Sequence, residues 1–158
     1  MGLDSVKADK LGAAPLKPEL DRIAAMKTVA EVPGVIAHEI PLGVRALIGP
    51  GVSQDDKNSD KMALYLRQSG LGLPNRDYYF NTDSRTKNIR AEYVKHVANT
   101  FQLLGQDAAT AQTNAAKVMA LETALAKSSR KLEALRDPYA NYHKMTIVQL
   151  NQLTPGTD

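Results

Sequence analysis

The sequence predicts a mainly α protein, in which an antiparallel helix pair and shorter helices accompany a small two-stranded β-ribbon. Aromatic residues make up only 5% of the chain, with no tryptophan, and alanine and leucine are plentiful, which favours helix packing over a β-sandwich. Apolar residues recur at helical spacing over about 84–131 and alternate with other residues within about 44–68. With 158 residues, the chain is expected to be one domain or a domain fragment.

The composition excludes several kinds of site and partner. The chain has no cysteine, which rules out disulfides, thiolate metal sites and a cysteine nucleophile. Its net charge of +3 is spread thinly and forms no basic stripe, so no nucleic-acid partner is expected. No apolar run approaches the roughly 20 residues that span a bilayer, and the first five residues lack the pattern of a signal peptide. We therefore expect no membrane segment and no signal peptide within this chain.

Short helices are predicted for the N-terminal quarter of the chain. Pro18 suits the first turn of a helix, where a backbone N–H is not needed. Thr28 and Glu31 have the spacing of a capping box, which marks a second helix start. Pro33-Gly34 then predicts a broken or restarted turn, and Pro41 is expected to end it.

The two-stranded ribbon is predicted over about 44–68. Segments 44–52 and 62–68 have the alternation typical of strands. The wholly polar stretch between them, 53–61, is expected to form the tip of a long hairpin. Because an isolated two-stranded ribbon is marginally stable in water, we expect it to depend on the helices.

The helix pair is predicted over about 84–131. The first helix should stop at Gly105, and the second should begin at Asp107, a natural N-cap, and run to about Lys131. The short connection between them makes the two helices antiparallel. The expected apolar faces are Ile89, Tyr93, Val97, Phe101 and Leu104 in the first helix, and Ala111, Ala115, Val118, Leu121, Leu125 and Leu132 in the second.

A short capped helix is predicted near the C-terminus, over about 146–153. Asp137-Pro138 interrupts the preceding helical pattern. Thr146 and Gln149 then have the spacing of a capping box, which places the helix start at Thr146.

No residues have the spacing of a metal site. His38-Glu39 resembles the start of a zinc-peptidase helix, but the second histidine is missing because that position is Leu42. Asp56 begins a possible calcium loop, yet its twelfth position is Arg67, where a glutamate is required. We therefore predict no metal ligand in this chain.

Catalytic and cofactor-binding residues are not predicted either. Gly70-x-Gly72 precedes a proline turn and not a helix, so it does not form a dinucleotide-binding loop. Glu122, the lone acidic residue within the second long helix, is expected to be exposed or ion-paired and not to act as a general base. The sequence thus offers no catalytic residue.

The most specific signal lies between Ser69 and Phe80. Residues 71–79, Leu-Gly-Leu-Pro-Asn-Arg-Asp-Tyr-Tyr, with Asp-Asp-Lys-Asn-Ser at 55–59, resemble the N-terminal half of neprilysin-like zinc metallopeptidases, the family of neprilysin, the endothelin-converting enzymes and bacterial oligoendopeptidase O. Further matching blocks follow in the same order, at 118–126, 136–138 and 142–146, although His143 stands where the family usually has asparagine. The motif residues expected to have structural roles are Gly72, Pro74, Arg76, Asp77, Tyr78, Tyr79, Asp137, Lys144 and Thr146.

This resemblance implies a function that the residues do not show by themselves. Family members are secreted, periplasmic or membrane-anchored endopeptidases that use one zinc ion, and their catalytic and helical domains enclose a chamber that limits substrate size. Their zinc ligands, His-Glu-x-x-His and a later glutamate, lie in the C-terminal half. The resemblance therefore implies that this chain is a non-catalytic N-terminal helical segment of a periplasmic, cell-envelope or secreted zinc metalloendopeptidase.

The implied partners follow from the same resemblance. They are the C-terminal catalytic domain of the same polypeptide and, for the parent enzyme, peptide substrates; zinc is expected in the parent enzyme and no cofactor in this chain. The alternative is a stand-alone helical interaction module without peptidase activity.

Local roles are also expected within the motif. Arg76 and Asp77 should fix the turn after Pro74 by hydrogen bonds, while Tyr78 and Tyr79 pack onto the helix pair. Alternatively, these aromatic residues lie at an interface with the catalytic half.

Overall fold

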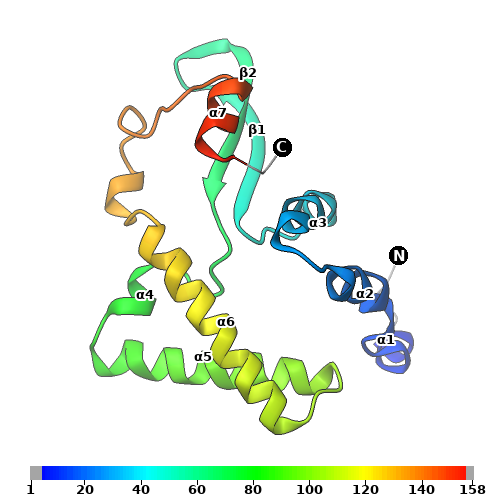
Figure 1. Ribbon diagram of the computed structural model, residues 1–158. Helices are drawn as coiled ribbons and strands as arrows, with labels where there is room; N and C mark the ends of the chain where they lie inside the picture. The colour runs from blue at the N-terminus through cyan, green and yellow to red at the C-terminus, as the bar shows by residue number, and fades with distance from the viewer. Residues whose placement is uncertain (1–4, 156–158) are drawn as a thin grey trace.

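The computed structural model describes residues 5–155, and this part of the chain is mainly α with one two-stranded antiparallel sheet, as the sequence predicts (Figure 1). The helices and strands are α1 (Ser5–Leu11), α2 (Lys17–Ala25), α3 (Val32–Glu39), β1 (Ile48–Asp55), β2 (Asn58–Gln68), α4 (Asp77–Phe80), α5 (Ser84–Leu103), α6 (Ala108–Ser128) and α7 (Ile147–Leu153). Short 3-10 turns lie at Ala14–Leu16, Val29–Glu31, Ile40–Leu42 and Glu133–Leu135.

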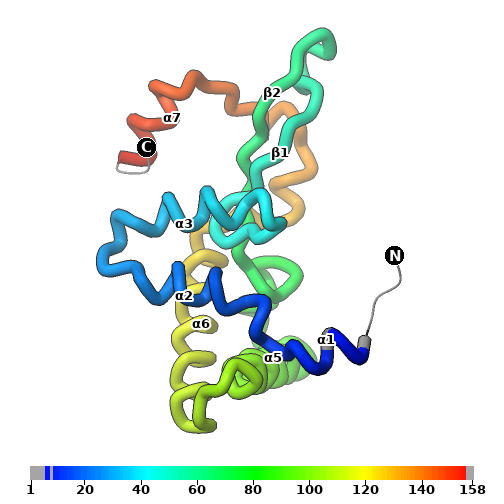
Figure 2. The backbone as a smooth tube through the Cα atoms, turned by 90° about the vertical axis from the view of Figure 1, so that its right-hand side faces the viewer, coloured from blue at the N-terminus to red at the C-terminus, as the bar shows by residue number. Residues whose placement is uncertain are grey.

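The described elements form three parts, one of which contains the long helix α6. Helices α5 and α6 form one end of the molecule, the ribbon of β1 and β2 forms the other, and α1 to α3 lie to one side (Figure 1). A view turned by 90° shows α5 end-on at the base, and the ribbon and α7 both near the opposite end (Figure 2). The fold therefore depends on the few connections that join these parts.

The N-terminal helices begin and end where the sequence predicts. The first turn of α2 contains a proline, and the capping box of Thr28 and Glu31 is formed, with the Thr28 amide donating to Glu31 Oε1 at 3.1 Å. Helix α3 restarts immediately, with Pro33 in its first turn. It gives way at Ile40 to a 3-10 turn that ends at Gly43, whose φ of 89° closes the segment.

The ribbon extends further into the predicted tip than expected. β1 and β2 continue to Asp55 and from Asn58, so the turn is only two residues long, and the pairing shifts register between Gln54 and Asp55. The tyrosine hydroxyl of Tyr65 helps to hold this end, because it donates to the Gln54 carbonyl at 2.9 Å and accepts from the Asp56 amide at 3.0 Å. The polar residues at 53–61 therefore belong mostly to the solvated ends of the two strands and not to a long loop.

The apolar face of the ribbon is not covered by helices. Val52, Met62 and Leu64 keep 68%, 64% and 65% of their surface exposed. The expectation that the ribbon depends on the helices for stability stays a prediction, since the described helices leave these side chains exposed.

The helix pair has the predicted connection. Gly105 has a φ of 94° in the turn, and Asp107 caps α6 by accepting hydrogen bonds from the amides of Ala109 and Thr110 at 3.0 Å. The first helix also has a cap that the sequence analysis missed, because Asp83 accepts a hydrogen bond from the Thr86 amide at 2.9 Å. The apolar residues predicted to line α5, Ile89 among them, are half-buried.

The predicted face of α6 is wrong at Leu121, whereas Val118 and Leu125 are half-buried. Leu121 is 59% exposed, and the neighbouring Glu122 and then Ala126 are buried instead. A straight helix with 3.6 residues per turn drifts away from a seven-residue repeat, so the buried face moves on by one residue after Ala115. The helix also ends at Ser128, before the predicted Lys131, because Ser129 is extended.

The chain makes a close approach at Gly70, where the ribbon leads into the next segment. Its φ is 84°, and a Cβ added there would lie 1.7 Å from the carbonyl oxygen of Ala46. A side chain at this position would therefore push apart the two segments that flank the ribbon.

We predict that Gly70→Ala lowers the free energy of unfolding by about 3 kcal/mol, because it combines left-handed strain with a backbone clash. The matched control is Gly105→Ala, which has a similar φ but no atom within 4 Å of the added Cβ. The control should cost only about 1 kcal/mol. Urea denaturation followed by circular dichroism measures both, and equal losses would contradict the close approach at Gly70.

Candidate functional site

A buried carboxylate lies where three parts of the fold meet. Glu122 of α6 is only 9% exposed. Its Oε2 accepts hydrogen bonds from the Tyr79 hydroxyl at 2.5 Å and from the Gly72 amide at 3.2 Å. Its Oε1 accepts a hydrogen bond from the Tyr93 hydroxyl at 2.7 Å. One side chain thus connects α6 with α4, with α5 and with the loop that follows the ribbon.

The apolar core surrounds this carboxylate. Tyr79 contributes its ring to the core and its hydroxyl to the polar centre, where it also accepts a hydrogen bond from the Leu73 amide at 3.1 Å. The buried members of the cluster are Leu73, Tyr79 and Ala126, and Leu71, Tyr78, Ile89, Tyr93 and Met119 pack against them.

Gly72 is required by the geometry of this centre. A Cβ at this position would lie 1.9 Å from the Tyr93 hydroxyl oxygen. Only glycine lets the backbone amide reach Glu122 while Tyr93 bonds to the same carboxylate. The glycine of the motif therefore serves close packing and not phosphate binding.

Both tyrosines are held in their neutral form. Burial, and then the hydrogen bond to Glu122, raise the pKa of Tyr79 to about 12. The same two causes raise the pKa of Tyr93. A carboxylate whose oxygens are occupied by three donors inside a core is suited to positioning the chain and not to accepting a proton from a substrate.

Two arginines tie the motif to the helices through backbone carbonyls. Arg76 Nε donates to the Ala126 carbonyl of α6 at 3.2 Å, and Arg90 Nη1 of α5 donates to the Tyr78 carbonyl at 2.6 Å. The turn itself is closed by Asn75, whose Oδ1 accepts from the Asp77 amide at 2.9 Å. Arg76 therefore reaches across to α6, and its Nη1 also lies 3.9 Å from Asp77 Oδ1 within the turn.

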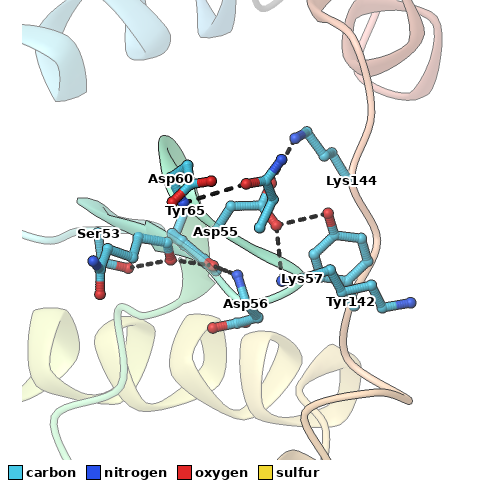
Figure 3. Close-up of polar contacts among 10 residues, drawn as sticks. Ser53, Asp55, Asp56, Lys57, Asp60, Tyr65, Tyr142 and Lys144 are labelled. Carbon is cyan, nitrogen blue, oxygen red and sulfur yellow. Dashed lines mark hydrogen bonds and ion pairs between the residues drawn. The ribbon is translucent and has the colours of Figure 1, made fainter.

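A second carboxylate holds the C-terminal segment against the ribbon (Figure 3). Asp55, at the end of β1, is 3% exposed and accepts hydrogen bonds from Lys144 Nζ at 2.5 Å and from the Tyr142 hydroxyl at 2.9 Å. The Lys57 amide donates to the same carboxylate at 3.0 Å, and the Lys57 ammonium lies 4.4 Å from the centre of the Tyr142 ring.

These donors stabilise the charged form of Asp55. The hydrogen bond from Lys144 is the largest cause, followed by that from the Lys57 amide, and together with Tyr142 they lower the pKa of Asp55 to about 2. The pKa of Lys144 is raised by the same hydrogen bond. The pair is therefore ionised at neutral pH.

A third link joins the base of the ribbon to the end of α6. Gln68 Nε2 donates to the Arg130 carbonyl at 3.2 Å, and the Arg130 amide donates back to Gln68 Oε1 at 2.9 Å. Arg130 also contacts Asn141. This reciprocal pair connects residues 62 positions apart in sequence.

Some of the motif residues expected to have structural roles lie in two groups. Gly72 and Tyr79 bind Glu122, and Lys144 binds Asp55. Asp137 and Thr146 instead make local contacts: Asp137 Oδ1 accepts from the Tyr139 and Ala140 amides at 2.9 and 3.0 Å, and Thr146 caps α7. The capping box with Gln149 is formed as predicted.

The sequence analysis missed the residues at the centre of both groups. Glu122 is buried and bonded to two tyrosine hydroxyls and a backbone amide, contrary to the expectation that it is exposed or ion-paired. Its one local signal is the position three residues after Met119 and four before Ala126, on the buried face of α6. Asp55 belongs to the polar hairpin tip and to a family motif in the sequence, but neither predicts its burial, because its partners lie 87 and 89 residues away.

The described residues do not assemble a metal site. Between residues 5 and 155, no three histidine, aspartate or glutamate side chains come together to hold a metal ion. His38 Nε2 lies 3.0 Å from Glu19 Oε2, but no third ligand joins this exposed pair. A catalytic zinc site needs three protein ligands, so zinc does not fit these residues. Over the same residues, no helix is long and apolar enough to cross a membrane.

Comparison with protein families gives a match over the whole chain. Residues 1–158 match the model of the N-terminal part of peptidase family M13. Neprilysin-3 of Drosophila melanogaster is 30% identical over 156 residues, which are 93% of this chain and 20% of that protein. Endothelin-converting enzyme 1 of Cavia porcellus is 38% identical over 108 residues, or 66% of this chain and 14% of that protein. The chain thus spans about one-fifth or less of the length of these relatives.

Solved structures of a zinc metalloprotease also match nearly the whole of this chain. The zinc metalloprotease ZMP1 of Mycobacterium tuberculosis in complex with an inhibitor matches with a TM-score of 0.85 and 30% identity, over 92% of this chain and 22% of that chain. Its open state matches with a TM-score of 0.87 and 30% identity, over 94% and 23%.

We predict that Tyr79→Phe lowers the free energy of unfolding by about 1–3 kcal/mol, because it leaves buried partners at Glu122 and Leu73 without their hydrogen bonds. Tyr139→Phe is the matched control, since Tyr139 is 78% exposed, and it should change stability by about 0.5 kcal/mol or less. Urea denaturation measures both variants, and similar values would argue against the polar centre.

The same tyrosine predicts an alkaline dependence. The unfolded residue releases its proton near pH 10, whereas folded Tyr79 keeps it until about pH 12. The unfolded state therefore binds fewer protons in this window, and the stability of the wild type should fall as the pH rises from 10 towards 12. The fall should be weaker in Tyr79→Phe, and parallel stability curves for the two proteins would contradict the raised pKa.

We also predict that Asp55→Asn loosens the C-terminal segment. Trypsin should cleave after Lys144 roughly tenfold faster, because cleavage follows local opening. Asp56→Asn makes the same charge change at the neighbouring exposed carboxylate and should leave the rate unchanged. In the wild type, the contribution of Asp55 to stability should be present above pH 4 and be lost as the pH falls towards 2, since the unfolded state then binds more protons. Equal cleavage of both variants would contradict the tether.

Proposed function

The chain belongs to peptidase family M13, and from this membership we propose that it is a non-catalytic N-terminal helical segment of a zinc metalloendopeptidase. In this proposal the segment helps to enclose the chamber in which peptide substrates are cleaved. Its partner is the C-terminal catalytic domain of the same polypeptide, and the parent enzyme is periplasmic, attached to the cell envelope or secreted.

The observation that carries this proposal is the extent of the match. The family model covers the whole chain, yet the chain corresponds to only 20% of Neprilysin-3. Zinc does not fit the described residues, as no three of their histidines and carboxylates come together. We therefore assign zinc binding and peptide cleavage to the part of the parent enzyme that lies outside this chain.

The internal structure supports a role in enclosing a chamber. A chamber wall needs a fixed shape and not titrating groups, and enclosure keeps water and large proteins from a reaction site. Here the carboxylates of Glu122 and Asp55 are each bonded to three donors that position the chain. The ZMP1 structures with an inhibitor and in the open state match this chain almost equally well, with TM-scores of 0.85 and 0.87. This agreement is expected if the segment keeps one internal arrangement while an enzyme opens.

The alternative function, a stand-alone interaction module, is not favoured. The similar proteins named above are several times longer than this chain, and they are a neprilysin, an endothelin-converting enzyme and a zinc metalloprotease. None of these observations points to a separate helical module.

The test compares the purified chain with the natural polypeptide that contains it. We predict that the 158-residue chain binds no stoichiometric zinc and cleaves no peptide, whereas the parent polypeptide binds one zinc ion and cleaves short peptides. Metal analysis and a peptide-cleavage assay measure these properties. Zinc-dependent cleavage by the chain alone would overturn the non-catalytic assignment.

A comparison of a short substrate with a long one tests whether the chamber limits substrate size. The parent enzyme should cleave a short peptide much faster than an unfolded protein as long as this chain. Equal rates for the two substrates would contradict the enclosing role while leaving the peptidase assignment intact.

A further inference from the structure

One face of the ribbon is entirely uncharged and mostly apolar. In the antiparallel register, Pro50 pairs with Leu66, Val52 with Leu64 and Gln54 with Met62. Paired residues, and residues two apart along a strand, lie on the same face. Ile48 and Gln68 complete this surface. We call these eight residues the apolar ribbon face.

This face is the more exposed side of the ribbon. Along β2, Met62, Leu64 and Leu66 are exposed at 64%, 65% and 43%, while Ala63 and Tyr65 between them are partly buried. The normal pattern of a half-covered sheet places apolar residues inside and polar residues outside. The ribbon has the reverse pattern, with its apolar side chains outside, so this face is unpartnered among the described residues.

Part of the opposite face is covered within the chain, at its Asp55 end. Asp55 lies on that face and binds Tyr142 and Lys144 of the C-terminal segment (Figure 3). Tyr65 lies beside it, with the Arg67 guanidinium 4.9 Å from its ring. The Asp55 end of the polar face is therefore bound within the chain. On the apolar ribbon face Gln68 binds Arg130, and the apolar side chains are left for a further partner.

The area of the apolar ribbon face distinguishes two candidate partners, a second copy of this chain and another surface of the same polypeptide. From strand geometry it measures about 25 Å by about 10 Å, or a few hundred Å². A stable interface between separate molecules covers about 800 Å² on each partner, so a second copy of this chain would not be held by this face alone. A surface of the same polypeptide needs no such area, because linkage gives it a high effective concentration.

We propose that the apolar ribbon face is a docking surface for an uncharged, apolar surface of the same parent polypeptide, in the part that lies outside this chain. The inference rests on the proposed function, in which this chain is about one-fifth of a larger peptidase. It assigns the ribbon a specific role: the Asp55 side fixes the C-terminal segment of this chain, and the other side contacts the remainder of the enzyme.

Single cysteines on adjacent residues of β1 test this proposal. This chain has no native cysteine, so Val52→Cys places a thiol on the apolar ribbon face. Ser53→Cys, a nearly isosteric change, places one on the opposite face and is the matched control. Both native residues are exposed here. Maleimide labelling, read by peptide mass spectrometry, gives the rate at each site in the 158-residue chain and in the parent polypeptide.

The expected result is fast labelling of Val52→Cys in the short chain and labelling at least about tenfold slower in the parent polypeptide, because a packed thiol reacts only after local opening. Ser53→Cys should react at similar rates in both. Equal rates for Val52→Cys in an active parent enzyme would overturn the docking surface and leave the proposed function standing. Protection that appears in the short chain as its concentration rises would overturn it in favour of a second copy.

Failure of the proposed function has a different signature. A parent polypeptide without zinc or peptide cleavage would overturn that function. The docking surface would fall with it, whatever the labelling rates.

Discussion

The arrangement of this chain depends on the buried carboxylate of Glu122. The core around it is small, and two of its three buried members, Leu73 and Tyr79, lie in the segment between Gly72 and Phe80. Hydrogen bonds to a charged group are stronger than those between neutral groups, and they are stronger still where water is excluded. Because donors from α4, α5 and the loop after the ribbon converge on this carboxylate, they fix where the ribbon leaves the helix pair.

The remaining connections are also polar and few. Gln68 and Arg130 join the base of the ribbon to the end of α6, and Asp55 holds the segment that leads to α7. Large apolar surfaces stay open elsewhere, for example at Val29, which is 85% exposed, and along the ribbon. A chain with this balance is held in shape by specific links and presents apolar faces outwards, as expected of a segment that is completed by the rest of a larger enzyme.

The sequence predicts the local features of this fold and misses the distant ones. The capping boxes at Thr28 and Thr146 and the N-cap at Asp107 were predicted because donor and acceptor lie within three residues of each other. The buried role of Glu122 was not, since its partners lie 29 to 50 residues away. The ribbon tip was also misjudged, because polar residues at a solvated strand end look like a loop. The motif at 71–79 resembles the family, but the physical reason for Gly72 and Tyr79 is their contact with Glu122, which only the structure shows.

Native-state hydrogen exchange at the Gly72 amide tests the central role of Glu122 most directly. This amide lies outside any helix or strand, and it donates its hydrogen bond to the Glu122 carboxylate. If the carboxylate holds the junction, the amide should exchange as slowly as those in the middle of α6, because both open only when the junction comes apart. Exchange as fast as that of the Asp60 amide, at the exposed ribbon tip, would contradict the account.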